Sequence, residues 1–543
     1  MPQITIDGKP CEFEGKKSIL EVALDNGIEI PHYCYHPGMS VVASCRICMA
    51  EIEAPNPRND NKLELIPKLM PTCQTPAADG QVVHLRSPKA VANQKAVMEF
   101  LLINHPLDCP VCDQAGECYL QDYSYKYGRS ESRFCETKIK QPKKDIGPHV
   151  LLYSDRCIMC TRCVRFTKEV TGTGEIGIFG RGSGEQIDVF PGKPLDNELS
   201  GNVVDICPVG ALLDKDFLMS MRVWNLTKTP SIDGITASGD NLSIEHNDGR
   251  IYRVKPRTNM EVNKWWTSDE IRYGWKFIHS DDRHRSPLIK TEDGQKECDW
   301  NKAYDAVKSG LTGVLESQGA GSLAVLISPM LPCEEAYLLG KLIIGLDGEA
   351  VIGIGPVPRS GEDKTFPGGY TICGEKCPNA RGVRRALNQL TDSILDYDQF
   401  LAAVEDERTS AVVVTGNYPS DWVTPELSKV LSGKYLVLID TLPNRLTETA
   451  DVLLPGATFA EKSGTFENHR NRLQSFQRAI LPIEFAKAEG QIALDLMARF
   501  GLGEPKRYDD QQVRIEMGDA FVTDVHHPVS EVKKVSDMQV VPL

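Results

Sequence analysis

The pattern of apolar and polar residues changes character along the chain. It begins with two short alternating runs between residues 3 and 13, around an Asp7-Gly8 pair that is typical of a tight hairpin turn. Ser18 then precedes a helically spaced apolar set that Asn26-Gly27 ends, so we expect a hairpin followed by a capped helix. Residues 87–102 show the helical spacing again and predict a second helix.

Beyond residue 300 short continuous apolar runs alternate with helically spaced segments. The runs predict buried parallel strands, and the whole alternation indicates an α/β domain with a mainly parallel sheet. Gly353-Ile-Gly355 follows one such run, but Pro358 stands at the third glycine position, so the dinucleotide-binding fingerprint is incomplete. The predicted strands are 322–327, 349–354, 411–414 and 435–439, and the predicted helices include 334–345 and 395–405.

Length and composition indicate a multidomain globular protein. The chain has 543 residues, which is enough for roughly three to five domains, and its 41% hydrophobic and 25% charged content is ordinary. The formal net charge of −14 argues against nucleic acid as a partner. No apolar run approaches about 18 residues, so we expect no transmembrane helix. The first ten residues do not resemble a signal peptide.

Cysteine supplies the candidate chemistry. Of the 17 cysteines, 13 lie at or before Cys207, and repeated C-x2-C spacing in a long chain favours metal binding over a disulfide framework. The compartment is therefore expected to be reducing, most simply a cytoplasm. The candidate ligands form three groups: Cys34, Cys45, Cys48 and Cys73; His105, Cys109, Cys112 and Cys118; and Cys157, Cys160, Cys163 and Cys207.

The first group has the spacing C-x10-C-x2-C-x24-C, starting at Cys34. It shares the logic of plant-type ferredoxins, in which an x2 pair and two outlying thiolates hold a 2Fe–2S cluster, although the first gap is wider. The hairpin and helix before Cys34 support a ferredoxin-like β-grasp domain. Zinc also binds C-x2-C thiolates and is the alternative. Cys11, inside the hairpin, is expected to be a small core residue.

The second group offers one imidazole and three thiolates. An imidazole in place of a thiolate makes a cluster site less negative and changes its redox potential. A zinc site on the same histidine and three cysteines is one alternative. Ligation by Cys135 instead of His105 is another.

The third group looks like a two-cluster bacterial ferredoxin that has kept one cluster. The two-cluster pattern is C-x2-C-x2-C-x3-C-P, with the fourth cysteine of each run serving the other cluster. Here the first run has Thr167 at its fourth position, and one complete set of four cysteines is left for a single 4Fe–4S cluster. The glycine-rich segment 172–184 is expected to be a loop between the half-motifs. Counting back from Cys207, the other run's cysteine positions hold Val203, Ser200 and Asn197.

The run His105-Pro-Leu-Asp-Cys109-Pro-Val-Cys112-Asp-Gln-Ala-Gly-Glu-Cys118, with the ferredoxin-like segment before it, closely resembles one family. This is the family of large iron–sulfur subunits of respiratory complex I, NADH:quinone oxidoreductase, which includes the mitochondrial 75 kDa subunit and its bacterial counterpart. The resemblance extends over residues 1 to about 280. It implies a 4Fe–4S cluster on His105 and the three cysteines of that run.

The resemblance also implies partners and a location. The expected partners are the flavoprotein subunit with FMN, the 2Fe–2S subunit, the subunit with two 4Fe–4S clusters, and the quinone-module subunits of the peripheral arm. The expected place is peripheral, on the cytoplasmic side of the bacterial inner membrane, with the membrane reached only through the complex. No nucleic acid is expected.

Residues 229–275 resemble the opening domain of molybdopterin oxidoreductases and of this family, through Val254-Lys-Pro-Arg-Thr-Asn-Met-Glu-Val-Asn-Lys-Trp-Trp. Some members hold an extra 4Fe–4S cluster there, on four cysteines spaced C-x2-C-x3-C-x27-C. We predict no cluster here, because no thiolate is present; a hard-cation site is the minor alternative. The same spacing in this chain falls on Asp233, Thr236, Asp240 and Ser268.

Residues 450–468 resemble a molybdopterin-oxidoreductase segment. No molybdopterin, FMN or NAD site is expected on this chain. Cys373 and Cys377, and likewise Cys298 and Cys333, are predicted to be structural thiols in the core or in loops. The tail from Tyr508, with His526 and His527, is expected to pack on a partner or to be partly disordered.

These inferences predict a multidomain α+β and α/β protein. Its function is expected to be electron transfer as a subunit of NADH:quinone oxidoreductase, with no catalytic residues of its own. The iron–sulfur subunit of an NAD-linked hydrogenase or of a formate dehydrogenase is the alternative. The predicted domains are a β-grasp 2Fe–2S domain (1–82), a helical 4Fe–4S segment with one histidine and three cysteines as ligands (83–125), a ferredoxin-like 4Fe–4S domain (140–222), an opening domain of molybdopterin-oxidoreductase type without its cluster (226–282) and a truncated α/β molybdopterin-oxidoreductase-like scaffold domain (283–543).

Overall fold

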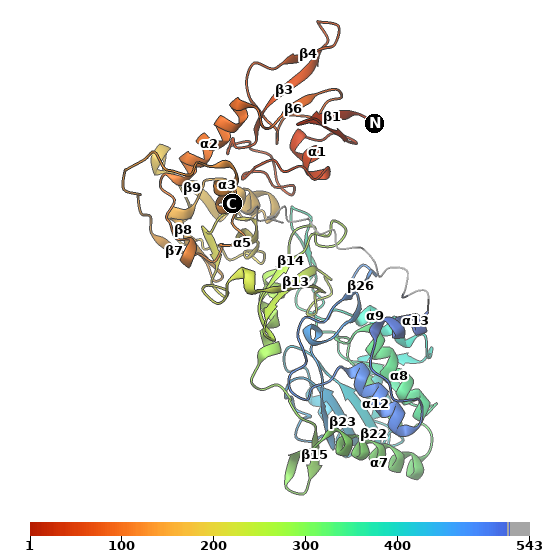
Figure 1. Cartoon of the computed structure of the whole chain (residues 1–543). Coiled ribbons are helices and arrows are strands. Elements are labelled where there is room, and N and C mark those ends of the chain that lie inside the picture. The colour runs from red at the N-terminus through yellow and green to blue at the C-terminus, as the bar shows by residue number, and fades with distance from the viewer. Residues whose placement is uncertain (519–520, 522–543) are drawn as a thin grey trace. The chain divides into compact units, whose positions relative to one another are not determined.

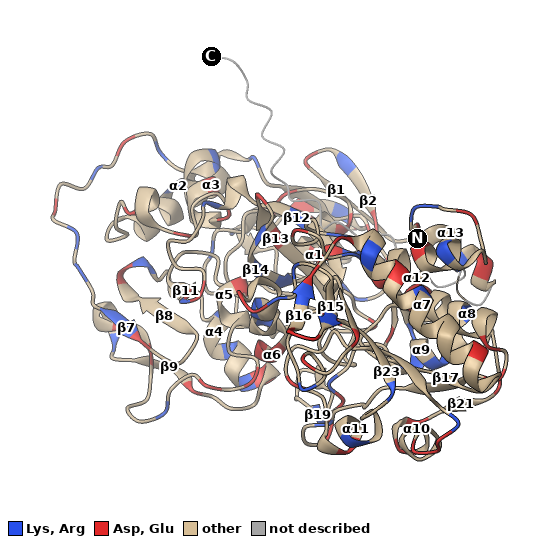
Figure 2. Cartoon of the chain, turned by 90° about the horizontal axis from the view of Figure 1, so that it is seen from below, with Lys and Arg blue, Asp and Glu red and all other residues tan. Residues whose placement is uncertain are grey.

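The computed structural model describes residues 1–518 and residue 521 (Figure 1). This part of the chain divides into two compact units. Unit 1 comprises residues 1–226 and 366–369, and unit 2 comprises residues 227–365 and the described residues from 370 onward. Figure 2 shows Lys and Arg interspersed with Asp and Glu in both units.

Unit 1 opens with a mixed sheet in the strand order β2-β1-β6-β3-β4, with β5 paired to β3. The predicted hairpin is confirmed, since β1 and β2 pair antiparallel around Asp7 and Gly8, both of which have positive φ. Ser18 caps α1 as predicted, because its Oγ accepts the N–H of Glu21. The elements are β1 (Gln3–Ile6), β2 (Lys9–Glu12), α1 (Ile19–Asp25), β3 (Met49–Asn56), β4 (Lys62–Leu65), β5 (Met70–Pro71) and β6 (Val82–His84).

The rest of unit 1 is made of short elements around the second and third ligand groups. The predicted helix over 87–102 is confirmed as α2, capped by Ser87. The loop prediction for 172–184 is wrong in part, because Ile176–Phe179 form a strand that pairs with β10. The elements are α2 (Pro88–Leu102), η1 (Cys109–Val111), α3 (Tyr119–Tyr127), β7 (Lys143–Asp145), β8 (Val150–Tyr153), η2 (Ser154–Arg156), α4 (Arg162–Arg165), η3 (Phe166–Val170), β9 (Ile176–Phe179), η4 (Gly182–Gly184), β10 (Gln186–Val189), α5 (Asn202–Ile206), β11 (Leu212–Asp214) and η5 (Val223–Asn225).

Unit 2 begins with a three-stranded antiparallel sheet in the order β12-β13-β14. Its core contains Ile244, Val254 and Trp275, together with Phe459 and Phe466 from much later in the chain. The elements are β12 (Thr227–Ile232), β13 (Asn241–Asn247), β14 (Arg250–Pro256), α6 (Asp269–Tyr273) and η6 (Gly274–His279).

The remainder of unit 2 is an α/β domain on an eight-stranded sheet, ordered β16-β15-β24-β23-β22-β17-β18-β21. The strands from β24 to β21 are parallel, so the predicted mainly parallel sheet is confirmed. The strands are β15 (Leu288–Thr291), β16 (Gly294–Glu297), β17 (Leu323–Ile327), β18 (Val351–Ile354), β21 (Ile394–Leu395), β22 (Ala411–Thr415), β23 (Tyr435–Asp440) and β24 (Val452–Pro455).

Helices cover both faces of this sheet. Alternate residues of β17 enter two cores, one shared with α7, α8 and α12 and the other with α10 and α11. The helices are α7 (Trp300–Gln318), α8 (Cys333–Leu346), α9 (Ala380–Leu387), α10 (Tyr397–Val404), α11 (Pro425–Val430), α12 (Glu489–Phe500) and α13 (Asp510–Met517). Smaller elements are β19 (Lys364–Thr365), β20 (Thr371–Ile372), η7 (Phe459–Glu461), β25 (Gly464–Glu467) and β26 (Leu473–Phe476).

The tail begins with a helix that packs within the chain itself. Tyr508 is half-buried, and residues 510–517 form α13, which packs on α8 within unit 2 through the ion pair of Arg514 with Glu334. His526 and His527 lie outside the described residues. In the described part of the chain no helix has the length and hydropathy needed to cross a membrane.

Candidate metal centres

The first ligand group comes together in unit 1 as two pairs of sulfur atoms. The Sγ atoms of Cys34 and Cys45 lie 3.5 Å apart, and those of Cys48 and Cys73 also lie 3.5 Å apart. Two thiolates on one tetrahedral metal, at a bond length of about 2.3 Å, stand about 3.8 Å apart, so each pair has the spacing of two ligands on one metal atom. Among the described residues no three His, Cys, Asp or Glu side chains are placed to hold a single metal ion.

The backbone around this group points donors at sulfur. Ala43 and Arg46, on either side of Cys45, have φ values of 50° and 57°, the left-handed region that non-glycine residues rarely occupy. The thiol of Cys45 and the backbone N–H groups of Ser44 and Cys45 hold the pKa of Cys34 well below its usual range. A hydrogen bond from Cys73 lowers the pKa of Cys48 to about 7. Hydrogen bonds of this kind stabilise thiolates.

The third ligand group lines one cavity. Cys157 ends η2, Cys163 lies in α4 and Cys207 ends α5, and Cys160 completes the set. Burial raises the pKa of Cys157 to about 12 and that of Cys160 to about 11, so a thiolate in this cavity needs a nearby cation. The other lining residues are mostly apolar: Leu152, Ile158, Thr161, Arg162, Ile187, Val209, Ala211 and Leu212.

The loop that carries Cys157 and Cys160 is bent toward the same cavity. Met159 and Thr161 have φ values of 52° and 60°. The bend lets the N–H of Met159 donate to the Sγ of Cys157 at 3.4 Å. Left-handed backbone at two non-glycine residues is strained, and strain of this kind is concentrated at binding sites.

The second ligand group surrounds η1 and the start of α3. Cys112 and Cys118 are buried, whereas Cys109 is exposed. Burial lowers the pKa of His105 to about 4, and its Nδ1 is buried without a hydrogen-bond partner. A neutral imidazole with an unpaired nitrogen fits the role of a metal ligand. Cys135, the alternative ligand, is exposed.

Gly210 was not singled out by the sequence, yet it makes the closest approach to this group. A Cβ at Gly210 would lie 2.2 Å from the Sγ of Cys112, so only glycine fits there. Gly210 follows Cys207 by three residues and thus joins the third group to the second. No signal in the sequence points to Cys112 as its neighbour.

Further contacts connect the second and third groups. Arg156, directly before Cys157, forms an ion pair with Asp108 at 2.8 Å. The N–H of Tyr119 donates to the carbonyl of Pro208 at 3.0 Å. One apolar core contains Cys34, Cys118 and Cys160, with Cys45, Cys157 and Cys207 packed against it, so it includes ligands of all three groups.

In unit 2, hydrogen bonds connect the four positions at which some family members carry cluster-binding cysteines. These positions are Asp233, Thr236, Asp240 and Ser268. Asp233 accepts the Oγ1 hydrogen of Thr236 at 2.5 Å. Tyr370 donates to Asp240 at 2.6 Å and accepts the N–H of Ser268 at 3.0 Å. Burial raises the pKa of Asp233 to about 6, and burial with the nearby Asp233 raises that of Asp240 to about 8. Tyr370 was not foreseen, because it lies over 100 residues from its partners in sequence.

The eight-stranded sheet reverses its strand order between β17 and β22, where doubly wound sheets bind ligands at the carboxyl ends of the strands. Side chains fill this position here. The Thr415 hydroxyl accepts the N–H of Ser328 at 2.8 Å, and Tyr418, which is buried, donates to the carbonyl of Pro356 at 2.7 Å. Cys333, Cys373 and Cys377 are also buried, in agreement with their prediction as structural thiols.

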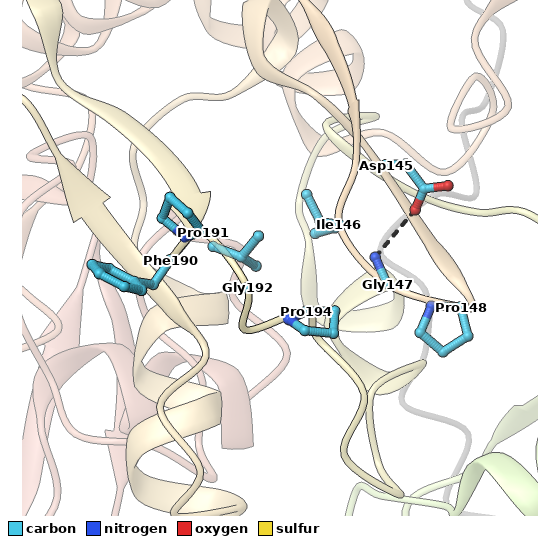
Figure 3. A pocket seen from close by; sticks show the side chains of 9 residues that line it. Asp145, Ile146, Gly147, Pro148, Phe190, Pro191, Gly192 and Pro194 are labelled. Carbon is cyan, nitrogen blue, oxygen red and sulfur yellow. Dashed lines mark hydrogen bonds between the residues drawn. The ribbon is translucent and has the colours of Figure 1, made fainter.

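A separate surface groove of about 440 Å³ lies in unit 1 (Figure 3). It is formed by Asp145, Ile146, Gly147, Pro148, Val189, Phe190, Pro191, Gly192 and Pro194. Its lining is mostly apolar and includes none of the predicted ligands.

Five family models match the chain. They are a 2Fe–2S iron–sulfur cluster binding domain (2–88), an NADH-ubiquinone oxidoreductase-G iron–sulfur binding region (94–133), an NADH-quinone oxidoreductase subunit 3 ferredoxin-like domain (147–213), an NADH-ubiquinone oxidoreductase NDSU1/NuoG-like 4Fe–4S domain (226–276) and molybdopterin oxidoreductase (403–499). These matches confirm the predicted fold class and show iron–sulfur binding domains.

Similar curated proteins carry consistent names. The chain is 37% identical over 437 residues to the mitochondrial NADH-ubiquinone oxidoreductase 78 kDa subunit of Neurospora crassa, which covers 78% of this chain and 54% of that protein. It is 33% identical over 431 residues to the 78 kDa subunit of Candida albicans (78% and 55%). It is 34% identical over 343 residues to a bacterial relative, a subunit of NADH-quinone oxidoreductase from Rickettsia felis (63% and 49%).

The chain thus spans about half the length of the curated relatives it matches. Among solved structures, a crystal structure of NAD+-reducing [NiFe]-hydrogenase matches with 28% identity and a TM-score of 0.35, covering 41% of this chain and 91% of that one. In its family models and its curated relatives, the chain is similar to the large iron–sulfur subunits of NADH–quinone oxidoreductase, respiratory complex I.

Proposed function

We propose that the chain is the iron–sulfur electron-transfer subunit of the peripheral arm of NADH:quinone oxidoreductase. It would relay electrons from the flavoprotein subunit toward the clusters nearest the quinone. One observation carries this proposal: a single apolar core in unit 1 contains ligands from all three groups. Close, fixed spacing of redox centres in a dry medium is what an electron relay requires.

The proposed ligands divide over three clusters. Cys34 with Cys45, and Cys48 with Cys73, would each bind one iron of a 2Fe–2S cluster, as the two sulfur pairs suggest. The other two groups would each bind a 4Fe–4S cluster. When bound, each cluster accepts and passes on one electron. The protein holds the ligands in place. It also excludes water from the Cys157 cavity and donates backbone N–H groups to sulfur, and both effects tune the reduction potential of the cluster.

We infer that unit 2 is a scaffold that carries neither a cluster nor molybdopterin, FMN or NAD. The matched NuoG-like domain model is named for a 4Fe–4S cluster, but the four expected positions of this chain lack thiols. Instead, the Thr236 hydroxyl donates to Asp233, and the Tyr370 hydroxyl donates to Asp240 and accepts the backbone N–H of Ser268. At the carboxyl ends of β17 and β22, where doubly wound sheets bind ligands, side chains such as Thr415 and Tyr418 fill the space.

The proposed partners are other complex I subunits: the flavoprotein subunit with FMN, the 2Fe–2S subunit, the subunit with two 4Fe–4S clusters, and the quinone-module subunits. The proposed location is the cytoplasmic side of a bacterial inner membrane, peripheral and held through the complex. The alternative, a subunit of an NAD-linked hydrogenase or a formate dehydrogenase, is less well supported, because the specific domain models and the curated relatives cited here are named for complex I.

The test is to purify the complex without oxygen and to count iron and acid-labile sulfide per chain, after subtracting the partners' clusters. We expect about ten iron atoms, with one 2Fe–2S and two 4Fe–4S signals in low-temperature EPR on reduction. A matched Cys157→Ser variant should lose only one 4Fe–4S signal. About fourteen iron atoms would show a further cluster, and zinc without sulfide would refute electron transfer.

A further inference from the structure

Two arginines in unit 1 are buried without a carboxylate partner. Arg162 and Arg165, both on α4, are only 5% and 6% exposed. In the described chain neither guanidinium forms an ion pair with a carboxylate, and the Nε atom of each is buried without a hydrogen-bond partner. Glu169 attracts Arg165, but its carboxylate accepts two hydrogen bonds from Ser40, at 2.5 and 2.8 Å.

Arg162 contacts a neighbour of one ligand from each group. Its guanidinium donates to the carbonyl of Ile206 at 3.1 Å and to that of Tyr35 at 2.5 Å. Its Cζ also lies 6.0 Å from the centre of the Tyr119 ring, within cation–π range. These three residues adjoin three predicted ligands in sequence: Cys207, Cys34 and Cys118.

Arg165 joins the first group to the third. One of its nitrogens, Nη2, donates to the carbonyls of Cys34 and Cys160, at 2.5 and 3.4 Å. The other, Nη1, donates to the carbonyl of Ser40 at 2.5 Å. Arg165 therefore bonds the backbone of a ligand from each of two groups, more than 100 residues apart in sequence.

These contacts give every Nη atom of the two arginines a hydrogen-bond acceptor, but they do not neutralise the charge. Burying an uncompensated cation is costly, and carbonyl groups carry no net charge. Iron–sulfur clusters on thiolate ligands are commonly anionic, and their potentials depend on net charge and on their surroundings. The three ligand groups are therefore the natural source of the negative charge that these guanidinium groups lack.

We propose that Arg162 and Arg165 are positioning residues that also supply the counter-charge of the proposed clusters. They hold the Cys34 loop against α4 and raise the reduction potentials of the centres on Cys34–Cys73 and on Cys157–Cys207. This inference rests on the proposed function, because it needs clusters at those ligands. A fixed positive charge favours the reduced state, which is one electron more negative than the oxidised state.

The test compares Arg162→Gln and Arg165→Gln with the lysine variants at the same positions, in the purified complex. The matched control is Arg58→Gln, since Arg58 is exposed in unit 1, in the turn between β3 and β4. An EPR-monitored redox titration gives the ratio of reduced to oxidised cluster at a fixed ambient potential. Iron and sulfide are counted in every sample.

For the clusters on Cys34–Cys73 and on Cys157–Cys207, we expect the glutamine variants to lower the ratio of reduced to oxidised cluster about tenfold. This corresponds to a reduction potential lower by about 59 mV for a one-electron couple. The lysine variants, which keep the charge, should restore most of it, and Arg58→Gln should not change it. An unchanged ratio in fully loaded glutamine variants would overturn the proposal. If the glutamine variants lack clusters altogether, lysine variants that bind the clusters with the wild-type potential support the counter-charge role. Lysine variants that also lack the clusters overturn it.

The same samples separate this inference from the proposed function. A wild-type complex without sulfide or EPR signals in this chain contradicts the proposed function itself. A wild-type complex with all three signals, beside loaded variants that titrate as the wild type does, contradicts only the role of the two arginines.

Discussion

At the scale of single residues, the ligands and their surroundings differ in how far the sequence shows them. Cys157, Cys160 and Cys163 stand close together in sequence because a cluster needs several thiolates from one loop, so spacing alone suggests them. Gly210 is different. Its importance comes from the sulfur of Cys112, almost 100 residues earlier, which only the folded chain brings within reach.

Replacement of Gly210 by alanine tests this contact. The new Cβ would lie 2.2 Å from the Sγ of Cys112 and 3.2 Å from the Cβ of Gln114, so the sulfur or the backbone must move. We expect loss of the 4Fe–4S signal assigned to the His105 group, with iron falling from about ten to about six atoms per chain. Iron analysis and EPR of the purified complex measure both.

The control is Gly184→Ala, because a Cβ at Gly184 meets no atom within 4 Å and its φ is not positive. This variant should retain full iron and all three signals. Full iron in Gly210→Ala, with an unchanged spectrum, would show that Cys112 is not held as a ligand beside Gly210.

At the scale of secondary structure, local signals predict an element when they are complete within it. Ser18 with Glu21 forms a capping box, and the α1 helix begins where that pair predicts. The apolar runs over 411–414 and 435–439 become the buried strands β22 and β23. Strand β9 forms inside the glycine-rich segment 172–184, for which the glycines predict a loop. Pairing with β10 outweighs the preference of the glycines for irregular structure.

Helix α7 shows how packing can reverse a local preference. Glycine inside a helix normally costs about 0.5–1 kcal/mol relative to alanine, so Gly→Ala should stabilise it. At Gly310, however, an added Cβ would lie 2.0 Å from the Cζ atom of Tyr435 on β23. The ring is held in place, since the Tyr435 hydroxyl donates to the carbonyl of Ala306 at 2.8 Å.

We therefore expect Gly310→Ala to destabilise α7 by about 1–3 kcal/mol, the usual cost of overpacking. Gly313→Ala, in the same helix, should stabilise it by about 0.5–1 kcal/mol, because nothing lies within 4 Å of its added Cβ. Hydrogen exchange of the α7 amides in the full chain measures both changes. Equal effects of the two substitutions would contradict the packing of Gly310 on Tyr435.

At the scale of the whole molecule, the predicted chemistry is confined to unit 1. One core contains ligands from all three of its groups, whereas Asp233, Thr236, Asp240 and Ser268 of unit 2 carry carboxylates and hydroxyls. The sequence shows this absence of thiols directly. It does not show what replaces them, because the partner of Asp240 is Tyr370, 130 residues later.

The buried carboxylates make the stability of unit 2 depend on pH. Burial and the nearby Asp233 raise the pKa of Asp240 to about 8 in the folded state, above its ordinary value of 3.8. Between about pH 4 and pH 8 the folded chain therefore holds a proton that the unfolded chain has released. Stability is fully present below about pH 4 and falls as pH rises toward 8, by up to about 1.4 kcal/mol per pH unit.

An Asp240→Asn variant should lose this dependence above about pH 6, while Asp233, with its pKa of about 6, still contributes between about pH 4 and pH 6. Asparagine keeps an oxygen that can accept the Tyr370 hydroxyl, so the fold should be retained. Opening free energies from hydrogen exchange of β12–β14 in the full chain, compared at about pH 5, 6.5 and 8, measure the slope.

The control for this variant is Asp293→Asn, at an exposed position between β15 and β16, which should leave the slope as in the wild type. Because the proposed ligands all belong to unit 1, the Asp240→Asn variant should also keep every EPR signal at its wild-type potential. A slope that persists above about pH 6 in this variant would assign the bound proton to another group. Loss of an EPR signal in this variant would contradict the placement of every cluster in unit 1.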